Sequence, residues 1–260
     1  MKPDYRNWVP LGMVRGFGAG ALVAAAASVA AFRFLSGAAG SAVAVLLGLL
    51  AVGLASATVW LVALRRAFDY GGKRQLARAI VEGTASRVAI PEGGTCLDVG
   101  CGSGALAIAV AKRNPAASVV GVDRWGPEYA SFSRELCERN AEAEGVRNVS
   151  FGRGDAVRRD FPDETFDAVV SNYVYHNIRA KNRGDLLLET LRTLKKGGKF
   201  AIHDIFSRAK YGDMREFVAE LKRKGYREVE LVDTTGGMFM ERAEARRLGL
   251  SGSALLIGVK

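Results

Sequence analysis

The feature that most constrains this chain is a run of three alternating glycines between an apolar segment and a helical one. Residues 97–104 read Leu-Asp-Val-Gly-Cys-Gly-Ser-Gly, and Ala-Leu-Ala-Ile-Ala-Val-Ala follows directly. A short apolar run that ends at glycines is typical of a buried strand, and an alanine-rich run is typical of a helix. Since glycine has no Cβ, a ligand can lie against bare backbone at the N-terminus of such a helix. The segment therefore predicts a strand, a ligand-binding loop and a helix in succession.

The spacing of the glycines separates two classes of nucleotide-type cofactor. The dinucleotide fingerprint is G-x-G-x-x-G, whereas this loop is G-x-G-x-G, which is one residue shorter. With the preceding Leu97-Asp98, the loop resembles the first motif of the class I S-adenosylmethionine (SAM)-dependent methyltransferases. The resemblance implies SAM as the cofactor. The loop residues that it assigns to cofactor binding are Asp98, Gly100, Cys101, Gly102 and Gly104.

Strands and helices alternate over the second part of the chain, which predicts a parallel sheet covered on both faces. The expected strands are 95–99, 118–123, 149–154, 166–172, 199–206, 227–233 and 254–259. The expected helices are 104–113, 127–144, 184–196 and 212–224, and no regular helix is expected in 234–252. The resemblance implies a doubly wound α/β sheet of seven strands, mostly parallel, whose last strand lies antiparallel beside the fifth.

Further cofactor-binding residues are expected where later strands end. Asp123 ends the second expected strand, where the doubly wound fold places an acid that accepts hydrogen bonds from ribose hydroxyls. An N-cap of the following helix is the alternative role for this residue. The resemblance makes Asp155 the partner of the adenine amino group, with the backbone N–H of Ala156 nearby; an exposed turn residue is the alternative. Arg124 and Asn172 complete the expected cofactor-binding set.

The residues after the fourth expected strand bear on the methyl acceptor. Family members that methylate base amines or protein glutamine usually carry an Asn/Asp-Pro-Pro-aromatic element here. This chain has Ser-Asn-Tyr-Val at 171–174, without either proline, so a nucleic acid acceptor is not expected. Histidine titrates near neutral pH, and His176 is therefore the expected general base if the acceptor must lose a proton. A histidine that packs behind the cofactor is the alternative.

Two long uncharged segments precede the catalytic part, at 16–32 and 34–64. Runs of about 18 or more apolar residues are candidate transmembrane helices, and we expect a helical hairpin at 14–34 and 42–64. A cleaved signal peptide is the alternative for the first run, but a second apolar run follows it instead of a polar mature segment. The expected domains are a membrane anchor at 1–66, a basic linker at 67–92 and a methyltransferase domain at 93–260.

Basic residues gather at both ends of the expected hairpin, whereas Arg33 alone lies near its turn. The flanking basic residues are Lys2, Arg6, Arg15, Arg65, Arg66, Lys73, Arg74 and Arg78. By the positive-inside rule, both chain ends and the catalytic domain should face the cytoplasm. The formal net charge of +10 suits attraction to anionic lipid headgroups at least as well as to nucleic acid.

The sequence as a whole predicts a membrane-anchored SAM-dependent methyltransferase with a small, lipophilic or membrane-associated acceptor. One alternative is a SAM-binding membrane protein with a role in assembly, and another is an enzyme that methylates a membrane protein. A nicotinamide-dependent reductase is a third, which the short glycine loop argues against. Three cysteines and two histidines show no metal-ligand spacing, so no metal is expected. The acceptor atom and the oligomeric state stay open at this stage.

Overall fold

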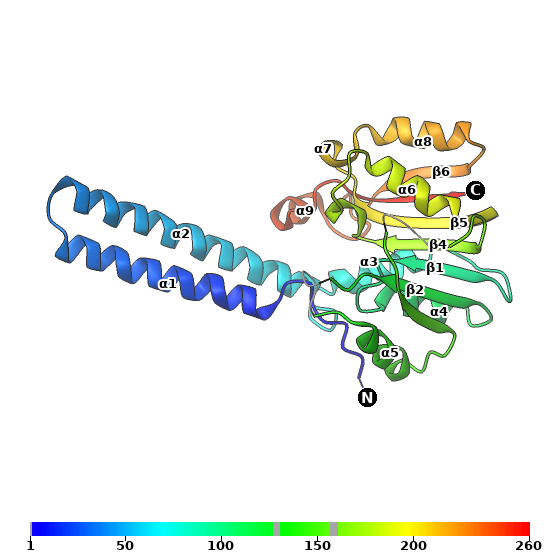
Figure 1. Ribbon diagram of the computed structural model, residues 1–260, viewed down its shortest axis with the longest axis horizontal. Coiled ribbons are helices and arrows are strands. Elements are labelled where there is room, and N and C mark those ends of the chain that lie inside the picture. The colour runs from blue at the N-terminus through cyan, green and yellow to red at the C-terminus, as the bar shows by residue number, and fades with distance from the viewer. Residues whose placement is uncertain (1, 127–130, 157–160) are drawn as a thin grey trace. The chain divides into compact units, whose positions relative to one another are not determined.

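The computed structural model describes residues 2–126, 131–156 and 161–260. The chain divides into two compact units, which are drawn in Figure 1. One unit is Asn7–Gln75, and the other combines Met1–Arg6 with Leu76–Lys260. The first is a helical hairpin and the second is an α/β unit.

The hairpin consists of α1 (Leu11–Phe34) and α2 (Gly37–Phe68). Helix α1 begins before the expected residue 14 and ends at residue 34 as expected, whereas α2 is longer than expected at both ends. Small residues let the two helices approach closely. Ser28 Oγ of α1 donates a hydrogen bond to Ala44 O of α2 at 2.6 Å, and a Cβ on Gly48 would lie 3.3 Å from the same hydroxyl. Both helices are long and apolar enough to cross a membrane, by length and composition alone.

The α/β unit contains a seven-stranded mixed sheet, as predicted. Its strands are β1 (Thr95–Val99), β2 (Ser118–Asp123), β3 (Val149–Arg153), β4 (Phe166–Asn172), β5 (Leu194–Ile205), β6 (Arg227–Asp233) and β7 (Ser253–Val259). The strand order is β3-β2-β1-β4-β5-β7-β6, and β7 runs antiparallel to both β5 and β6. The expected antiparallel seventh strand beside the fifth is therefore confirmed. Strand β5 begins earlier than expected because Leu194 already pairs with Phe166 of β4.

The helices of this unit differ from the expected ones mainly at their ends. They are α3 (Leu76–Ala85), α4 (Ala105–Arg113), α5 (Arg134–Ala143), the 3-10 helix η2 (Tyr175–Asn177), α6 (Arg183–Arg192), α7 (Arg208–Tyr211), α8 (Met214–Arg223) and α9 (Arg242–Leu248). Residues 127–130 of the expected helix 127–144 lie outside the described residues, and α5 begins only after Ser133, whose hydroxyl accepts from Leu136 N. The expectation that 234–252 holds no regular helix is wrong, because α9 forms there and ends at Gly249 with φ +71°.

The order of the strands reverses between β1 and β4. The chain moves outward from β1 to β2 and β3, and outward in the other direction from β4 to β5. Loops at the carboxyl ends of such neighbouring parallel strands form the ligand-binding crevice of doubly wound sheets. The loops after β1 and β4 do meet, since a Cβ on Gly100 would collide with the side chain of Val174.

The amino-terminal segment (residues 2–6) packs on α5 of the α/β unit, although the whole hairpin separates it from that unit along the chain. Asp4 N donates to Asn140 Oδ1 at 2.7 Å, and Asn140 Nδ2 donates to Asp4 O at 3.1 Å and to Ser103 O at 3.0 Å. Tyr5 Oη donates to Glu144 Oε1 at 3.2 Å. The buried Asn140 amide thus joins this segment to the glycine-rich loop. The expected division at residue 66 had placed residues 2–6 with the hairpin.

Replacing Asn140 with alanine should destabilise the protein. The change removes all three hydrogen bonds and leaves the carbonyl oxygen of the buried Ser103 without this partner. We expect the free energy of unfolding to fall by about 1–3 kcal/mol, measured by chemical unfolding of the full chain in detergent. Glu142→Ala, an exposed position on the same helix, serves as the control and should stay within about 0.5 kcal/mol of the parent. Equal effects of the two substitutions would show that the Asn140 bridge contributes no stability.

Candidate functional site

The loop between β1 and α4 turns at three glycines with left-handed backbone. The φ angles of Gly100, Gly102 and Gly104 are +72°, +55° and +82°, a region that other residues enter only at a cost. A Cβ on Gly100 would also lie 2.3 Å from Cγ2 of Val174. Backbone conformation and close approach therefore both require glycine at position 100.

Asp98 lies at the inner end of this loop and is 1% exposed. Among the residues that the structure describes, none hydrogen-bonds either of its carboxylate oxygens. Burial raises the pKa of Asp98 to about 8; the nearby backbone N–H of Ala107 opposes this rise, and the negative charge of Asp123 adds to it to a smaller degree. Buried polar groups are normally paired, so an unpaired carboxylate beside a side-chain-free loop is suited to receive a positively charged or hydrogen-bond-donating group.

Asp123, at the end of β2, holds the loop in shape. Its Oδ2 accepts from Gly102 N at 2.9 Å, and its Oδ1 accepts from Trp125 N at 2.7 Å. Trp125 Nε1 in turn donates to Gly102 O at 2.9 Å. A carboxylate has about four lone-pair sites, so Asp123 keeps acceptor capacity for further donors.

The other residues expected to bind cofactor take up different positions. The Cys101 side chain is buried and faces β2, where a Cβ on Gly121 would lie 3.1 Å from its Cβ, so only its backbone can face a ligand. At the ends of β2 and β3, an open pocket of about 420 Å³ is lined by Arg124, Arg153, Gly154 and Asp155. Arg124 and Asp155 are exposed there, and Ala156 is half-buried.

Asn172, at the end of β4, is held by the neighbouring strand. Its Oδ1 lies 2.9 Å from Nδ1 of His203 on β5, and Nε2 of His203 lies 3.0 Å from Thr234 Oγ1. Burial lowers the pKa of His203 to about 3, so the ring is neutral at physiological pH. The Thr234 hydroxyl has one proton, which is shared between Nε2 of His203 and the carbonyl oxygen of Ser253 at 3.0 Å. His203 is thus a support for the Asn172 amide.

His176, in η2, is paired with a carboxylate that the sequence analysis did not single out. Its Nδ1 lies 2.6 Å from Oδ1 of Asp204, which is fully buried near the end of β5. Since β4 and β5 are parallel neighbours, an acid at the end of β5 and a histidine just after β4 meet at one edge of the sheet. The placement that drew attention to Asp98 and Asp123, an acid at a strand end, applies equally to Asp204.

Tyr173 connects the two histidines and has strained backbone. Its φ is +56°, which is rare for a bulky residue and is found most often at functional sites. The ring lies edge-on to His203 and to His176, with centroid distances of 4.7 and 5.8 Å. Its hydroxyl is 2.9 Å from Ser253 Oγ, and burial raises the pKa of Tyr173 above its ordinary range.

Comparisons with known proteins show what this region is similar to. The profile of the methyltransferase-domain family matches residues 97–202, from β1 into β5, and every expected site residue lies within that stretch. Residues 97–202 are thus similar to the methyltransferase domains of known enzymes. The nicotinamide-dependent reductase is thereby set aside.

Two curated relatives and one solved structure show how far the similarity extends. A sterol 24-C-methyltransferase of Aspergillus fumigatus is 35% identical over 121 residues, which are 46% of this chain and 30% of that protein. A demethylmenaquinone methyltransferase of Thermus thermophilus is 36% identical over 106 residues, 41% of this chain and 44% of that protein. The alignments therefore span less than half of either relative. The crystal structure of the cyclase SpnF covers 74% of this chain and 85% of its own, with a TM-score of 0.56 and 19% identity, which shows the fold.

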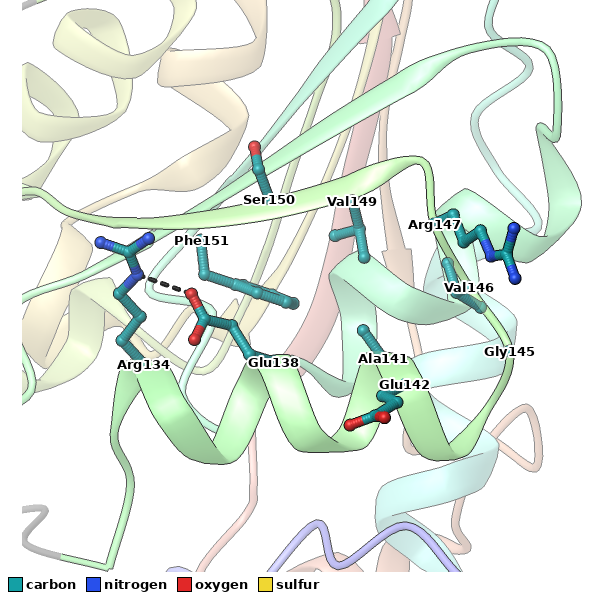
Figure 2. A pocket seen from close by; sticks show the side chains of 10 residues that line it. All are labelled: Arg134, Glu138, Ala141, Glu142, Gly145, Val146, Arg147, Val149, Ser150 and Phe151. Carbon is teal, nitrogen blue, oxygen red and sulfur yellow. Dashed lines mark hydrogen bonds and ion pairs between the residues drawn. The ribbon is translucent and has the colours of Figure 1, made fainter. Parts of the chain in front are cut away.

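A second pocket, of about 500 Å³, lies in the α/β unit. Figure 2 shows it between α5 and β3, with Arg134 paired to Glu138 at 2.8 Å on one side. None of the expected site residues lines it. Met214 and Phe217 of α8 are buried in the core.

Proposed function

We propose that this protein is a membrane-anchored methyltransferase that moves a methyl group from SAM to a small lipophilic acceptor. The observation that carries the proposal is the buried, unpaired carboxylate of Asp98 beneath a glycine loop that Asp123 holds open to a ligand. SAM is an amino acid joined to a nucleoside, so it carries hydrogen-bond donors for both carboxylates. Its ammonium suits Asp98, and its ribose hydroxyls suit Asp123.

The remaining residues fit the same ligand. The backbone of Gly100, Gly102 and Gly104 carries no side chains where the cofactor would approach. Asp155 and Ala156 follow the end of β3, and we infer that the Asp155 carboxylate and the Ala156 N–H receive the adenine. The cofactor supplies a methyl group already activated by its bond to a positively charged sulfur. The protein then has to orient the two partners and exclude water, and orientation alone can contribute roughly 7–11 kcal/mol.

The helical hairpin supports anchoring in a membrane. Large apolar side chains point outward along both helices, and among them Leu22, Phe32 and Val59 are 74%, 73% and 70% exposed. A continuous apolar surface of this kind is stable only against another apolar phase. Small residues in the contact between the helices are typical of packing within a bilayer, where close backbone approach replaces the hydrophobic effect.

The amino-terminal segment supports the expected topology. Because residues 2–6 and Leu76–Lys260 belong to one compact unit, the hairpin starts and finishes at that unit. Two membrane crossings return a chain to the side from which it started. The basic residues at both ends of the hairpin favour the cytoplasmic side for the catalytic unit.

The anchor also bears on the acceptor. An enzyme held at a bilayer meets lipophilic molecules at high local concentration, and the two relatives are named for methylating a sterol and demethylmenaquinone. We therefore favour a small lipophilic acceptor over a membrane protein. A role in assembly with little catalysis is the remaining alternative, since the fold alone does not fix the reaction.

The proposal is tested with the full chain purified in detergent and with native membranes. Calorimetric titration should show binding of SAM and none of NADH. Incubation with methyl-labelled SAM and native membranes should then place the label in a small molecule that extracts into organic solvent. Label that stays with protein would favour a protein acceptor. SAM binding without any labelled product would favour the assembly role.

Replacing Asp123 with alanine should weaken SAM binding strongly. The change removes the acceptor for the ribose and also the bond that shapes the loop at Gly102. A loss of about 2–4 kcal/mol corresponds to a Kd roughly one hundredfold higher, measured by the same titration. The control is Asp163→Ala, whose side chain is 72% exposed and away from the loop. An unchanged Kd in the Asp123 variant would remove this residue from the binding site.

A further inference from the structure

We propose that the acceptor presents a hydroxyl group, and that His176, oriented by Asp204, takes the hydroxyl proton as the methyl group is transferred. The inference rests on the proposed function and adds the chemical class of the acceptor to it. It follows from four features of the His176–Asp204 pair: the surroundings of the carboxylate, the tautomer of the ring, the support of the backbone, and the place of the pair in the fold.

Asp204 is a fully buried carboxylate whose two oxygens are surrounded by N–H groups. Oδ1 lies 2.6 Å from Nδ1 of His176 and accepts from Ile205 N at 2.6 Å. Oδ2 accepts from Tyr175 N at 2.8 Å and from His176 N at 3.2 Å. Charge-assisted hydrogen bonds to backbone N–H groups hold such a group in one position. The carboxylate is therefore a rigid partner for the imidazole.

This pairing fixes the tautomer of His176. A carboxylate only accepts hydrogen bonds, so Nδ1 carries the proton and Nε2 of the neutral ring keeps its lone pair. Within the described part of the chain no group hydrogen-bonds Nε2, and the His176 side chain is 13% exposed. The ring therefore offers a basic nitrogen with little access to water.

Residues from α6 and α7 hold the backbone of η2 in place. Lys210 Nζ donates to His176 O at 3.3 Å, and Arg183 Nε donates to Tyr175 O at 3.2 Å. Arg183 Nη1 also donates to Lys210 O at 3.0 Å, which joins the Arg183 side chain to the backbone of α7. A general base must be positioned within hydrogen-bond reach of the proton that it takes, and this support supplies the rigidity.

The pair lies beside the cofactor loop. Val174, two residues before His176, is the side chain that packs against Gly100. Asn172 and Tyr173 lead from β4 into the same turn. The basic nitrogen is thus on the segment that meets the glycine loop at the switch point of the sheet, where ligands of doubly wound folds lie.

Among the common classes of methyl acceptor, a hydroxyl group has the greatest need of a general base such as the His176–Asp204 pair. A free amine or a thioether already offers a lone pair, whereas a hydroxyl oxygen is a weak nucleophile until its proton leaves. In the proposed step the O–H bond breaks, its proton goes to Nε2 of His176, and the oxygen electron pair forms the bond to the methyl carbon. The carbon–sulfur bond breaks with its electron pair on sulfur, which becomes a neutral thioether. Asp204 then stabilises the imidazolium until it returns the proton to water.

The first test identifies the bond that holds the transferred methyl group. Full-length protein is incubated with methyl-labelled SAM and native membranes, and the labelled lipid extract is divided into two portions. An ether should resist mild alkali and should release labelled methyl iodide in hot hydriodic acid. Label released by alkali indicates an ester, and label that resists both treatments indicates carbon or nitrogen. Either of these results would overturn the inference while leaving the methyltransferase in place.

The second test uses variants of the pair. His176→Gly should lower the single-turnover rate by about a hundredfold or more, with the Kd for SAM within about twofold, and added imidazole should restore part of the rate. Asp204→Asn should lower the rate about tenfold or more, but should add little to the loss in the His176→Gly background. Asn177→Ala, the exposed neighbour in η2, is the matched control. The pair would have a structural role only if imidazole did not restore the rate of His176→Gly and if the rate losses of the two single variants added in the double variant.

The two levels of the proposal fail in different ways. If the wild-type protein does not bind SAM in calorimetry and no label is transferred, the proposed function is wrong and the inference falls with it. If label is transferred to something other than a hydroxyl, only the inference is wrong.

Discussion

Asp98→Asn should make the ligand-free protein more stable and should weaken its binding of SAM. The carboxylate is buried without a hydrogen-bond partner among the described residues, and its desolvation lowers the stability of the folded protein. Asparagine has nearly the same shape and no charge. The substitution removes the desolvation of a buried charge, and it also removes the negative charge that would receive the ammonium group of the ligand.

The gain in stability should depend on pH with a definite sign. The pKa of Asp98 is about 8 in the folded protein, above the ordinary value of 3.8. Below pH 3.8 the raised pKa does not change the free energy of unfolding. Between pH 3.8 and the folded-state pKa, the free energy of unfolding falls with each pH unit, and above the folded-state pKa the loss is complete. One pH unit corresponds to about 1.4 kcal/mol, so the upper limit of the cost is on the order of 5 kcal/mol. The difference between variant and parent should therefore grow from about pH 4 to pH 8 and then level off.

Denaturant unfolding at several pH values, together with calorimetry, measures both effects. The Kd for SAM should rise about one hundredfold or more, because breaking a buried charge pair typically costs about 3–5 kcal/mol. Asp167→Asn is a control of opposite sign. Partial burial raises the pKa of Asp167, but hydrogen bonds from Lys195 and Thr95 outweigh it and lower the pKa. That variant should be less stable than the parent above the ordinary pKa. A less stable Asp98→Asn protein with unchanged affinity would refute the role assigned to this carboxylate.

Gly100→Ala should abolish measurable SAM binding. The new Cβ would lie 2.3 Å from Cγ2 of Val174, and the backbone there has a φ of +72°. Either the glycine loop or the turn after β4 has to move, and both belong to the proposed site. Gly93→Ala is a matched control, since φ is +70° and a Cβ there meets no atom within 4 Å. The left-handed backbone alone costs about 1–2 kcal/mol, so the control should lose that stability and keep its affinity.

A second substitution separates the two causes in Gly100→Ala. Shortening the neighbour in a Gly100→Ala, Val174→Ala double variant makes room for the Cβ and leaves only the backbone strain. Part of the SAM affinity should return, as measured by calorimetric titration. If the double variant binds no better than the single one, the contact with Val174 is not what the glycine protects.

Much of the α/β fold could be predicted because its signals are local. Several strands, such as β1 and β2, are short and largely apolar, with glycine or an acidic residue at an end, and β1, β2, β4 and β6 were predicted to the residue. The position of β7 came from the family resemblance and not from its own residues. The acids at the carboxyl ends of β1 and β2, Asp98 and Asp123, were recognisable from their places in these strands. Their contacts, such as the bond from Gly102 N to Asp123, follow from neighbouring strands in the sheet.

What could not be predicted depends on residues far apart in the chain. Asp204 looks like any acid at the end of a strand until η2 brings His176 within 2.6 Å of it. The role of Asn140 was hidden for the same reason, since its partner Asp4 is 136 residues away. Helix α9 was missed because it has only seven residues, too few to show a helical period.

The contact between Asp4 and Asn140 also sets an order of events during synthesis. Residues 2–6 leave the ribosome before the two long helices, and their docking place on α5 is made only after both helices have emerged. In the membrane-anchored arrangement that we propose, the segment has to stay undocked on the side of the bilayer where the remainder of the chain is completed. Were it carried to the opposite side, the glycine-rich loop would lose the support that reaches it through Asn140 and Ser103. Correct insertion of the first helix would then be a condition for a complete cofactor site.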